Sequence, residues 1–295
     1  MELPSRLVGR LKEDLELIPN EISTHSNHHI GINFYDDLSK LHLLAVKAGI
    51  KRAYFDSVKL PSIYQYVPLT SIDSTTLTDD TKFKIMMLKR AQTTAERLGL
   101  KFYVSNISRL DFVDTDSIPK EIVEQHARIV IPAKEFWIYS DEQVLDEIRK
   151  VEQGKMRHGD LLGYPSCCVD WLSQVKTLLL ELCYEYYCKE QDPTKTEKLL
   201  KFLTENVEQV PRDEVAEVNR KISIHVAMTC QKFPFVVHHA CGNCIDHQET
   251  PTSQLNTTYR SFAKLISPGL YSSIIKGARK YVYNYTKDWP SGPIQ

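Results

Sequence analysis

The strongest constraint on this chain is the placement of its seven cysteines, which all lie between Cys167 and Cys244. Four of them form two tight pairs, the adjacent Cys167 and Cys168 in GYPSCCV and the Cys241-x-x-Cys244 pair in HACGNC. Three histidines flank the second pair: His238, His239 and His247. Thiolates and imidazoles grouped in this way are the ligands that zinc ions and iron–sulfur clusters take. The pattern predicts that two stretches more than seventy residues apart fold against each other.

The composition is that of an ordinary globular protein. The chain has 295 residues, of which 42% are hydrophobic and 25% charged, and its net charge is −1. Such a balance gives no global electrostatic preference for nucleic acid or for an anionic membrane. No apolar run approaches the ~18–20 residues that cross a bilayer, and the charged N-terminal segment lacks the apolar core of a signal peptide. We therefore expect a cytoplasmic protein with no membrane partner, whose cysteines are ligands or redox thiols rather than disulfides.

The first half of the chain predicts alternating strands and helices. We expect strands at 29–35, 51–56, 101–107 and 127–132, the last continuing through 136–139. Between and after them, helical spacing indicates helices at 36–49 and 82–98 and a third helix opened by a capping box, Ser140 to Gln143. Strands that alternate with helices favour an α/β layer with some parallel pairing.

The second half is predicted to be mainly helical. Helices are expected at 168–189, 194–208, 213–230, 252–265 and 270–284, with one extended segment at 233–239. The fold class is thus α/β, with an N-terminal mixed α/β domain over 1–153 and a mainly helical, cysteine-bearing domain over 154–295. The boundary between them is soft and falls near 153–160.

The segment from Gly159 to Val169, GDLLGYPSCCV, together with the downstream His239, Cys241 and Cys244, resembles the DUF483 family. This is a mainly prokaryotic group without an assigned function. The resemblance covers roughly residues 127–265 and implies that the two cysteine motifs form one shared site, without implying an activity. The chain departs from the family pattern after Cys244, where relatives carry a small polar residue.

The local spacing suggests which side chains would bind a metal. A C-x-x-C turn brings two sulfurs to one side, and Gly242 and Asn243 tolerate the tight backbone that it needs. In an extended segment His239 and Cys241 would face the same way, so we expect His239 rather than His238 to bind. Adjacent side chains diverge, so we expect one of Cys167 and Cys168 to bind and the other to pack.

The candidate metal ligands are accordingly Cys167, Cys168, His239, Cys241 and Cys244. A set rich in thiolates favours zinc, with an iron–sulfur cluster as the alternative, over magnesium, calcium or manganese. Buried thiols without a metal, or a metal-free dithiol redox pair, are the other interpretations. If the protein is an enzyme, a small-molecule substrate would lie between the two domains, with His158 as an acid–base residue and Asp160 as its orienting partner.

A second class of function is suggested by residues 270–289, where lysines and arginines alternate with tyrosines. Such side chains contact phosphates and stack on bases, so a nucleic-acid-associated protein of the tRNA-modification type, with a structural metal, is the alternative hypothesis. An amphipathic packing helix with a solvated rim would show the same pattern. The sequence predicts neither the substrate nor the oligomeric state.

Overall fold

The computed structural model describes residues 3–20, 22, 34–59, 79–105, 133–174 and 226–286. Several predicted elements lie wholly or mostly outside these residues: the start of strand 29–35, strand 127–132, helix 194–208, and most of helices 168–189 and 213–230. Within the described part the fold is mainly helical around a small sheet, which agrees with the predicted mixed α/β class.

The sheet contains three strands: β1 (Ala53–Lys59), β2 (Lys101–Val104) and β3 (Ala133–Tyr139). Their order is β1-β3-β2, and β3 is antiparallel to both neighbours, with Trp137 opposite Phe55 on one side and Tyr103 on the other. The prediction of parallel pairing is therefore wrong for the described strands. β1 and β2 do run in the same direction and are joined through α3 (Asp79–Arg97), but β3 lies between them and takes both sets of hydrogen bonds.

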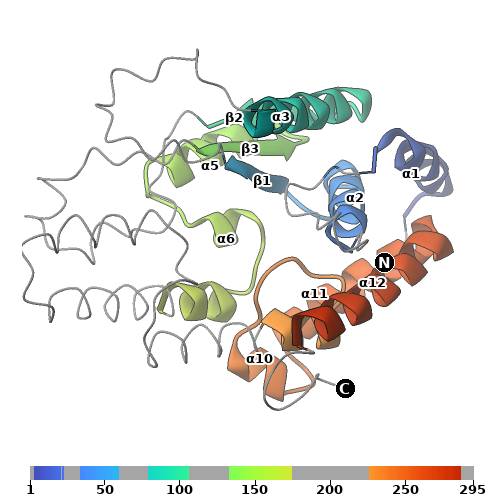
Figure 1. Ribbon diagram of the computed structural model, residues 1–295, viewed down its shortest axis with the longest axis vertical. Coiled ribbons are helices and arrows are strands. Elements are labelled where there is room, and N and C mark those ends of the chain that lie inside the picture. The colour runs from blue at the N-terminus through green and yellow to red at the C-terminus, as the bar shows by residue number, and fades with distance from the viewer. Residues whose placement is uncertain are drawn as a thin grey trace, which may run out of the picture.

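Side chains of β3 alternate between two apolar layers, as the period of a strand requires. Phe136 and Ile138 belong to the larger core, which includes residues of α2 (Phe34–Lys47) and α3. Trp137 and Tyr139 belong to a smaller core formed with α5 (Glu142–Glu152) and α6 (His158–Leu161). The sheet thus has helices on both faces (Figure 1).

Helix α5 begins one residue later than the predicted capping box requires. Its N-cap is Asp141, whose carboxylate accepts a hydrogen bond from the Gln143 amide at 3.0 Å. The prediction of Ser140 as the cap is wrong, because the first turn starts at Glu142 and an aspartate there satisfies a free helical N–H equally well.

The C-terminal layer is a pair of helices, α11 (Pro251–Ile266) and α12 (Pro268–Thr286), which confirms the helices predicted at 252–265 and 270–284. α2 lies between this pair and the sheet, and α1 (Ser5–Leu17) contacts α2 and α11 (Figure 1). The larger core includes residues from both sides of the predicted boundary, such as Leu41, Phe136 and Phe262. The division into two domains stays a prediction.

Short elements carry the cysteine motifs: helical residues 166–174 and 226–232, and α10 (Gly242–Asp246). Two predictions fail in the described part. Phe34 and Tyr35, the end of predicted strand 29–35, belong to α2, and within the predicted extended segment 233–239 residues 234 and 235 form a turn. No described helix combines the length and apolarity that a bilayer crossing needs.

Candidate metal centre

Four cysteine sulfurs lie close together between the helical residues 166–174 and α10. The Cys167 Sγ lies 3.9 Å from that of Cys168 and 3.7 Å from that of Cys244, and the Cys168 and Cys244 sulfurs are 3.7 Å apart. With Cys241 included, all four sulfurs lie within 4.8 Å of one another, so the group could hold a metal ion. Cys168, Cys241 and Cys244 are buried, and Cys167 is partly exposed.

The first pair of cysteines is positioned by a tight turn. Gly163 has a φ of +73°, a conformation that favours glycine, and the Tyr164 amide then donates to the Gly159 carbonyl at 2.8 Å. The next helical turn starts after Pro165, whose carbonyl accepts from the Cys168 amide at 2.9 Å. Contrary to the prediction, neither Cys167 nor Cys168 packs elsewhere: in this first turn both sulfurs flank the same point.

The second pair is positioned by contacts at both ends of α10. Cys241 is its N-cap residue, and the Cys241 amide donates to the Cys168 sulfur at 3.4 Å. At the other end the Lys232 ammonium donates to the carbonyl oxygens of Ile245 and His247. A helix of five residues has little stability of its own, so these anchors and the sulfur contacts fix its place.

A threonine links the sulfurs to a buried histidine. The Thr252 hydroxyl, in the first turn of α11, lies 3.4 Å from the Cys168 sulfur and 3.1 Å from Nε2 of His238. The His238 ring packs on the Tyr164 ring, with centroids 4.9 Å apart. The sequence analysis did not identify Thr252 as part of the site, and the only signal for it is its place two residues after a capping threonine.

His239 is not a member of the group of four close ligand atoms. The argument for it assumed an extended chain at residues 239–241, in which the side chains of 239 and 241 would face the same way. In the structure these residues belong to no strand and follow a bend at 238, and the buried histidine that Thr252 links to the centre is His238.

Without a cation the site disfavours several thiolates at once. Burial, followed by hydrogen bonds to Cys244 and Cys241, raises the pKa of Cys167 to about 11, and burial also raises the pKa of Cys168. Burial acts in the same direction on Cys244, but hydrogen bonds from Thr252 and from the other thiols outweigh it and lower its pKa to about 7. Burial, together with the charges of His239 and Lys51, lowers the pKa of His238 to about 3, so its imidazole is neutral at physiological pH.

A buried lysine joins the sheet layer to the site. Lys51 is 5% exposed; its ammonium lies 3.4 Å from Nδ1 of His42 and 5.5 Å from the centre of the Tyr164 ring. His42 Nε2 lies 3.2 Å from the Phe235 carbonyl, to which it donates, so Nδ1 is the acceptor for Lys51. Burial lowers the pKa of Lys51 to about 7.

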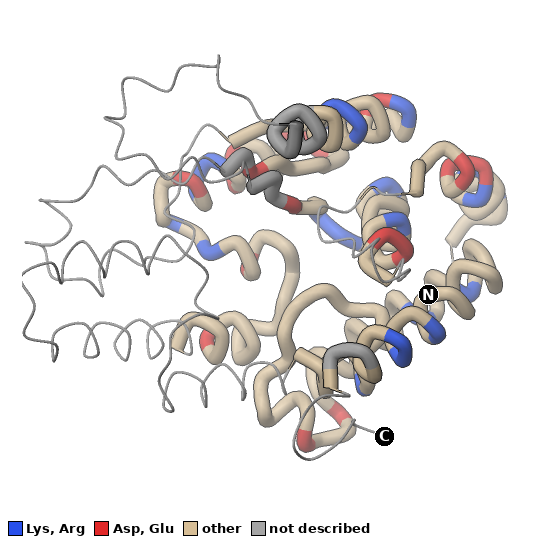
Figure 2. Tube along the Cα trace, in the orientation of Figure 1, with Lys and Arg blue, Asp and Glu red and all other residues tan. Residues whose placement is uncertain are grey.

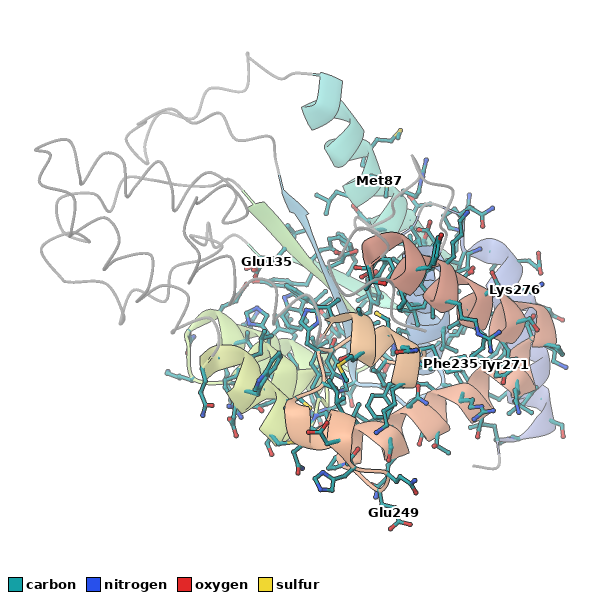
Figure 3. The ribbon with its side chains drawn as sticks, turned by 60° about the horizontal axis from the view of Figure 1, so that its bottom comes forward. Met87, Glu135, Phe235, Glu249, Tyr271 and Lys276 are labelled. Carbon is teal, nitrogen blue, oxygen red and sulfur yellow. The ribbon has the colours of Figure 1, made fainter. Side chains whose placement is uncertain are left out.

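The predicted acid–base pair has different partners in the structure. Asp160 accepts two hydrogen bonds from Arg157, at 2.8 and 2.9 Å. The carboxylate beside His158 is Glu135 of β3 (Figure 3), with 3.6 Å between Oε2 and Nε2. The His158 ring stacks on Trp137, with centroids 5.5 Å apart. Glu135 could not be linked to His158 from sequence, because the two residues are distant along the chain.

Comparison with other proteins adds no identification: no family model, no curated protein and no solved structure matches the chain. The resemblance to the DUF483 family stays a prediction. The function must therefore be argued from the site itself.

Proposed function

We propose that the chain is a zinc protein in which Cys167, Cys168, Cys241 and Cys244 bind one structural zinc ion. The observation that carries this proposal is the spacing of the sulfurs. A zinc–sulfur bond of about 2.3 Å implies a tetrahedron whose edges are about 3.8 Å long. The three resolved sulfur–sulfur distances, 3.7, 3.7 and 3.9 Å, match those edges.

The same spacing argues against the iron–sulfur alternative. In a cluster the cysteine sulfurs are divided between two or more irons joined by bridging sulfides, so sulfurs bound to different irons lie farther apart than the edges of one coordination sphere. Four sulfurs within 4.8 Å of one another fit a single ion better. Four thiolates around one ion are typical of zinc, and magnesium, calcium and manganese prefer oxygen ligands.

The surroundings support a structural role for the ion. Four protein sulfurs fill a tetrahedral zinc site and leave no open position for a substrate, so we place neither Lewis-acid chemistry nor electron transfer at this centre. The Cys241 N–H and the Thr252 hydroxyl both lie within hydrogen-bond reach of the Cys168 sulfur, as outer contacts to a metal-bound thiolate do. The ion would join the helix of Cys167 and Cys168 to the turn that leads into α11.

The decisive experiment is metal analysis of the full chain, purified anaerobically, by inductively coupled plasma mass spectrometry. We expect about one zinc per chain and, after exchange, the visible spectrum of a tetrahedral cobalt tetrathiolate. The Cys168→Ser and Cys244→Ser variants should each lose most of the metal. Cys230→Ser is the matched control, because Cys230 lies outside the group of four sulfurs, and it should keep its zinc.

Three outcomes would contradict the proposal. A brown protein with several irons per chain would indicate a cluster, and one iron per chain would indicate a mononuclear iron site. A colourless protein that takes up no zinc at micromolar concentration, and whose thiols oxidise to disulfides, would indicate the metal-free redox alternative.

A further inference from the structure

The two C-terminal helices carry positive charge without any negative charge. Between residues 250 and 286 there is no aspartate or glutamate, although the whole chain has a net charge of −1. The cations in this stretch are five: Arg260, Lys264, Lys276, Arg279 and Lys280. In Figure 2 the blue positions on α11 and α12 are accordingly not accompanied by red ones.

On α12 the cations share one side of the helix. Lys276, Arg279, Lys280 and Tyr283 follow the spacing i, i+3, i+4 and i+7, which places them along one stripe, and all four are exposed. Tyr283 is 57% exposed, the highest value among the large apolar side chains of the described residues. We call these four residues the α12 stripe.

Two further cations, on α11, lie beside an aromatic ring in the first turn of α12. Arg260 donates to the Tyr271 hydroxyl at 3.4 Å, and the Lys264 ammonium lies 5.0 Å from the centre of the same ring. Tyr271 in turn stacks on Phe235, with centroids 5.4 Å apart and planes at 13° (Figure 3). Among the described residues, no salt bridge neutralises Arg260, Lys264, Lys276 or Arg279.

We propose that the α12 stripe binds single-stranded nucleic acid, with its cations on phosphates and Tyr283 stacked on an unpaired base. An exposed aromatic ring among exposed cations is the combination by which proteins hold single strands. The stripe is separate from the proposed zinc centre, since the four cysteines of that centre lie on other elements than α12.

The structure disfavours the other anionic partner, a membrane surface. A helix that lies on a bilayer inserts its apolar side into the lipid. The apolar side of α12, which includes Leu270, Ile274, Ala278 and Val282, is already buried in the protein. A duplex is also disfavoured, because paired bases are not available to stack on Tyr283.

The test is fluorescence anisotropy of the full chain with a labelled mixed-sequence 20-nucleotide RNA over a range of salt concentrations. The stripe variant changes Lys276, Arg279 and Lys280 to Gln. Its affinity should fall by more than tenfold at low salt, and the slope of log K against log salt should become shallower by about 2, since each lost phosphate contact accounts for about 0.7. Tyr283→Ala should weaken binding by roughly tenfold without changing the slope.

The matched control changes three exposed cations on other elements, Lys89 and Arg97 of α3 and Lys150 of α5, to Gln. It removes the same charge and should change the slope by less than one. Circular dichroism and zinc content are measured on every sample, which separates loss of nucleic-acid binding from loss of the metal or of the fold. If the triple variant does not fold, the single variants Lys276→Gln and Arg279→Gln should each lower the slope by about 0.7.

The other arms use the same sequence as single-stranded DNA, a duplex of it, polyglutamate, and vesicles rich in phosphatidylserine. Binding of either single strand, more tightly than the duplex, supports the proposal. Equal loss in the stripe and control variants would overturn it, and so would tighter binding of the duplex, polyglutamate or vesicles than of the single strands. Absence of any binding at micromolar protein would also overturn it.

Discussion

The sheet region and the cysteine region of this protein are stabilised in different ways. In the sheet, β3 pairs with a strand on each side and places fully buried apolar side chains in a core on either face, Ile138 in one and Trp137 in the other. The cysteine region consists of short helices and turns that are fixed by polar contacts from Lys232, Thr229 and Thr252. Apolar burial stabilises both regions, since Phe235 and Ile245 also belong to the larger core. The short elements of the cysteine region depend in addition on these few polar contacts and, as we propose, on a metal.

Metal removal should give the largest difference in stability between the two regions. We expect a chelator, or the Cys168→Ser substitution, to lower the stability of residues 226–250 by at least about 4 kcal/mol, because zinc binding energy is folding energy for the elements that it joins. Hydrogen exchange measured by mass spectrometry should show lost protection at 226–250 and retained protection at 133–139. Equal loss of protection in both segments would contradict the comparison, and Cys230→Ser serves as the control.

A cavity made in the sheet by mutation should have the opposite effect: it should lower the stability of the sheet and leave the zinc centre intact. Ile138 is fully buried in β3, so Ile138→Ala should lower the free energy of unfolding by about 3 kcal/mol. Denaturant unfolding measures the loss, and zinc content should stay at one per chain. Loss of zinc in the folded variant would show that the two regions are not separable in this way.

The connection between the regions can be tested at Gly159. A Cβ added there would lie 2.4 Å from Cγ2 of Val169, in the helix that carries Cys167 and Cys168. Gly159→Ala should therefore cost about 2 kcal/mol of stability and weaken zinc binding, because Val169 must shift together with the helix turn that holds the cysteines.

Gly9 in α1 is the matched control for this substitution, since a Cβ there would meet nothing within 4 Å. Gly9→Ala should leave zinc binding unchanged and stabilise the chain by about 0.5–1 kcal/mol. A stable Gly159→Ala variant with unchanged zinc affinity would contradict the predicted steric overlap.

Substitution of Lys51 should give the smallest change in the free energy of unfolding, and the size of this change should depend on pH. In the folded chain the pKa of Lys51 is about 7, whereas its usual value is 10.5, so unfolding takes up a proton between these two values. The stability due to this group therefore rises with pH across that window and is lowest below pH 7.

Lys51→Met removes the buried charge and should stabilise the chain by about 1 kcal/mol at pH 7, after the lost contact to His42 is counted. The gain should shrink by roughly 1 kcal/mol per pH unit toward pH 9. Urea unfolding at several pH values measures both effects, and a gain that is constant with pH would contradict the argument.

Sequence reasoning predicted the elements whose apolar residues have a clear period. The helices at 36–49, 82–98, 252–265 and 270–284 are confirmed; three of them bury one apolar side, and α2 is buried on most sides. The pairing of the strands could not be derived: the period of β3 indicates two buried faces, but nothing in it specifies that β3 lies between β1 and β2.

For the site, the grouping of the two cysteine motifs was predicted and the structure brings their four sulfurs together. The histidine was assigned by assuming an extended chain at 239–241; in the structure these residues belong to no strand, and the histidine that Thr252 links to the Cys168 sulfur is His238. Glu135 and Thr252 were not found, because their partners, His158 and Cys168, are distant in sequence and only tertiary contact joins them.

The contact between Cys168 and Cys241 closes a loop of 73 residues. Because the entropy of closing a loop grows only with the logarithm of its length, the ends of this loop would tolerate large changes in the number of residues between them. A metal bound by both cysteine motifs would hold the two ends of the intervening segment together, as the ends of an insertion in a folded domain are held. Variation in length among related chains should then concentrate between the two cysteine motifs, while the motifs themselves keep their internal spacing.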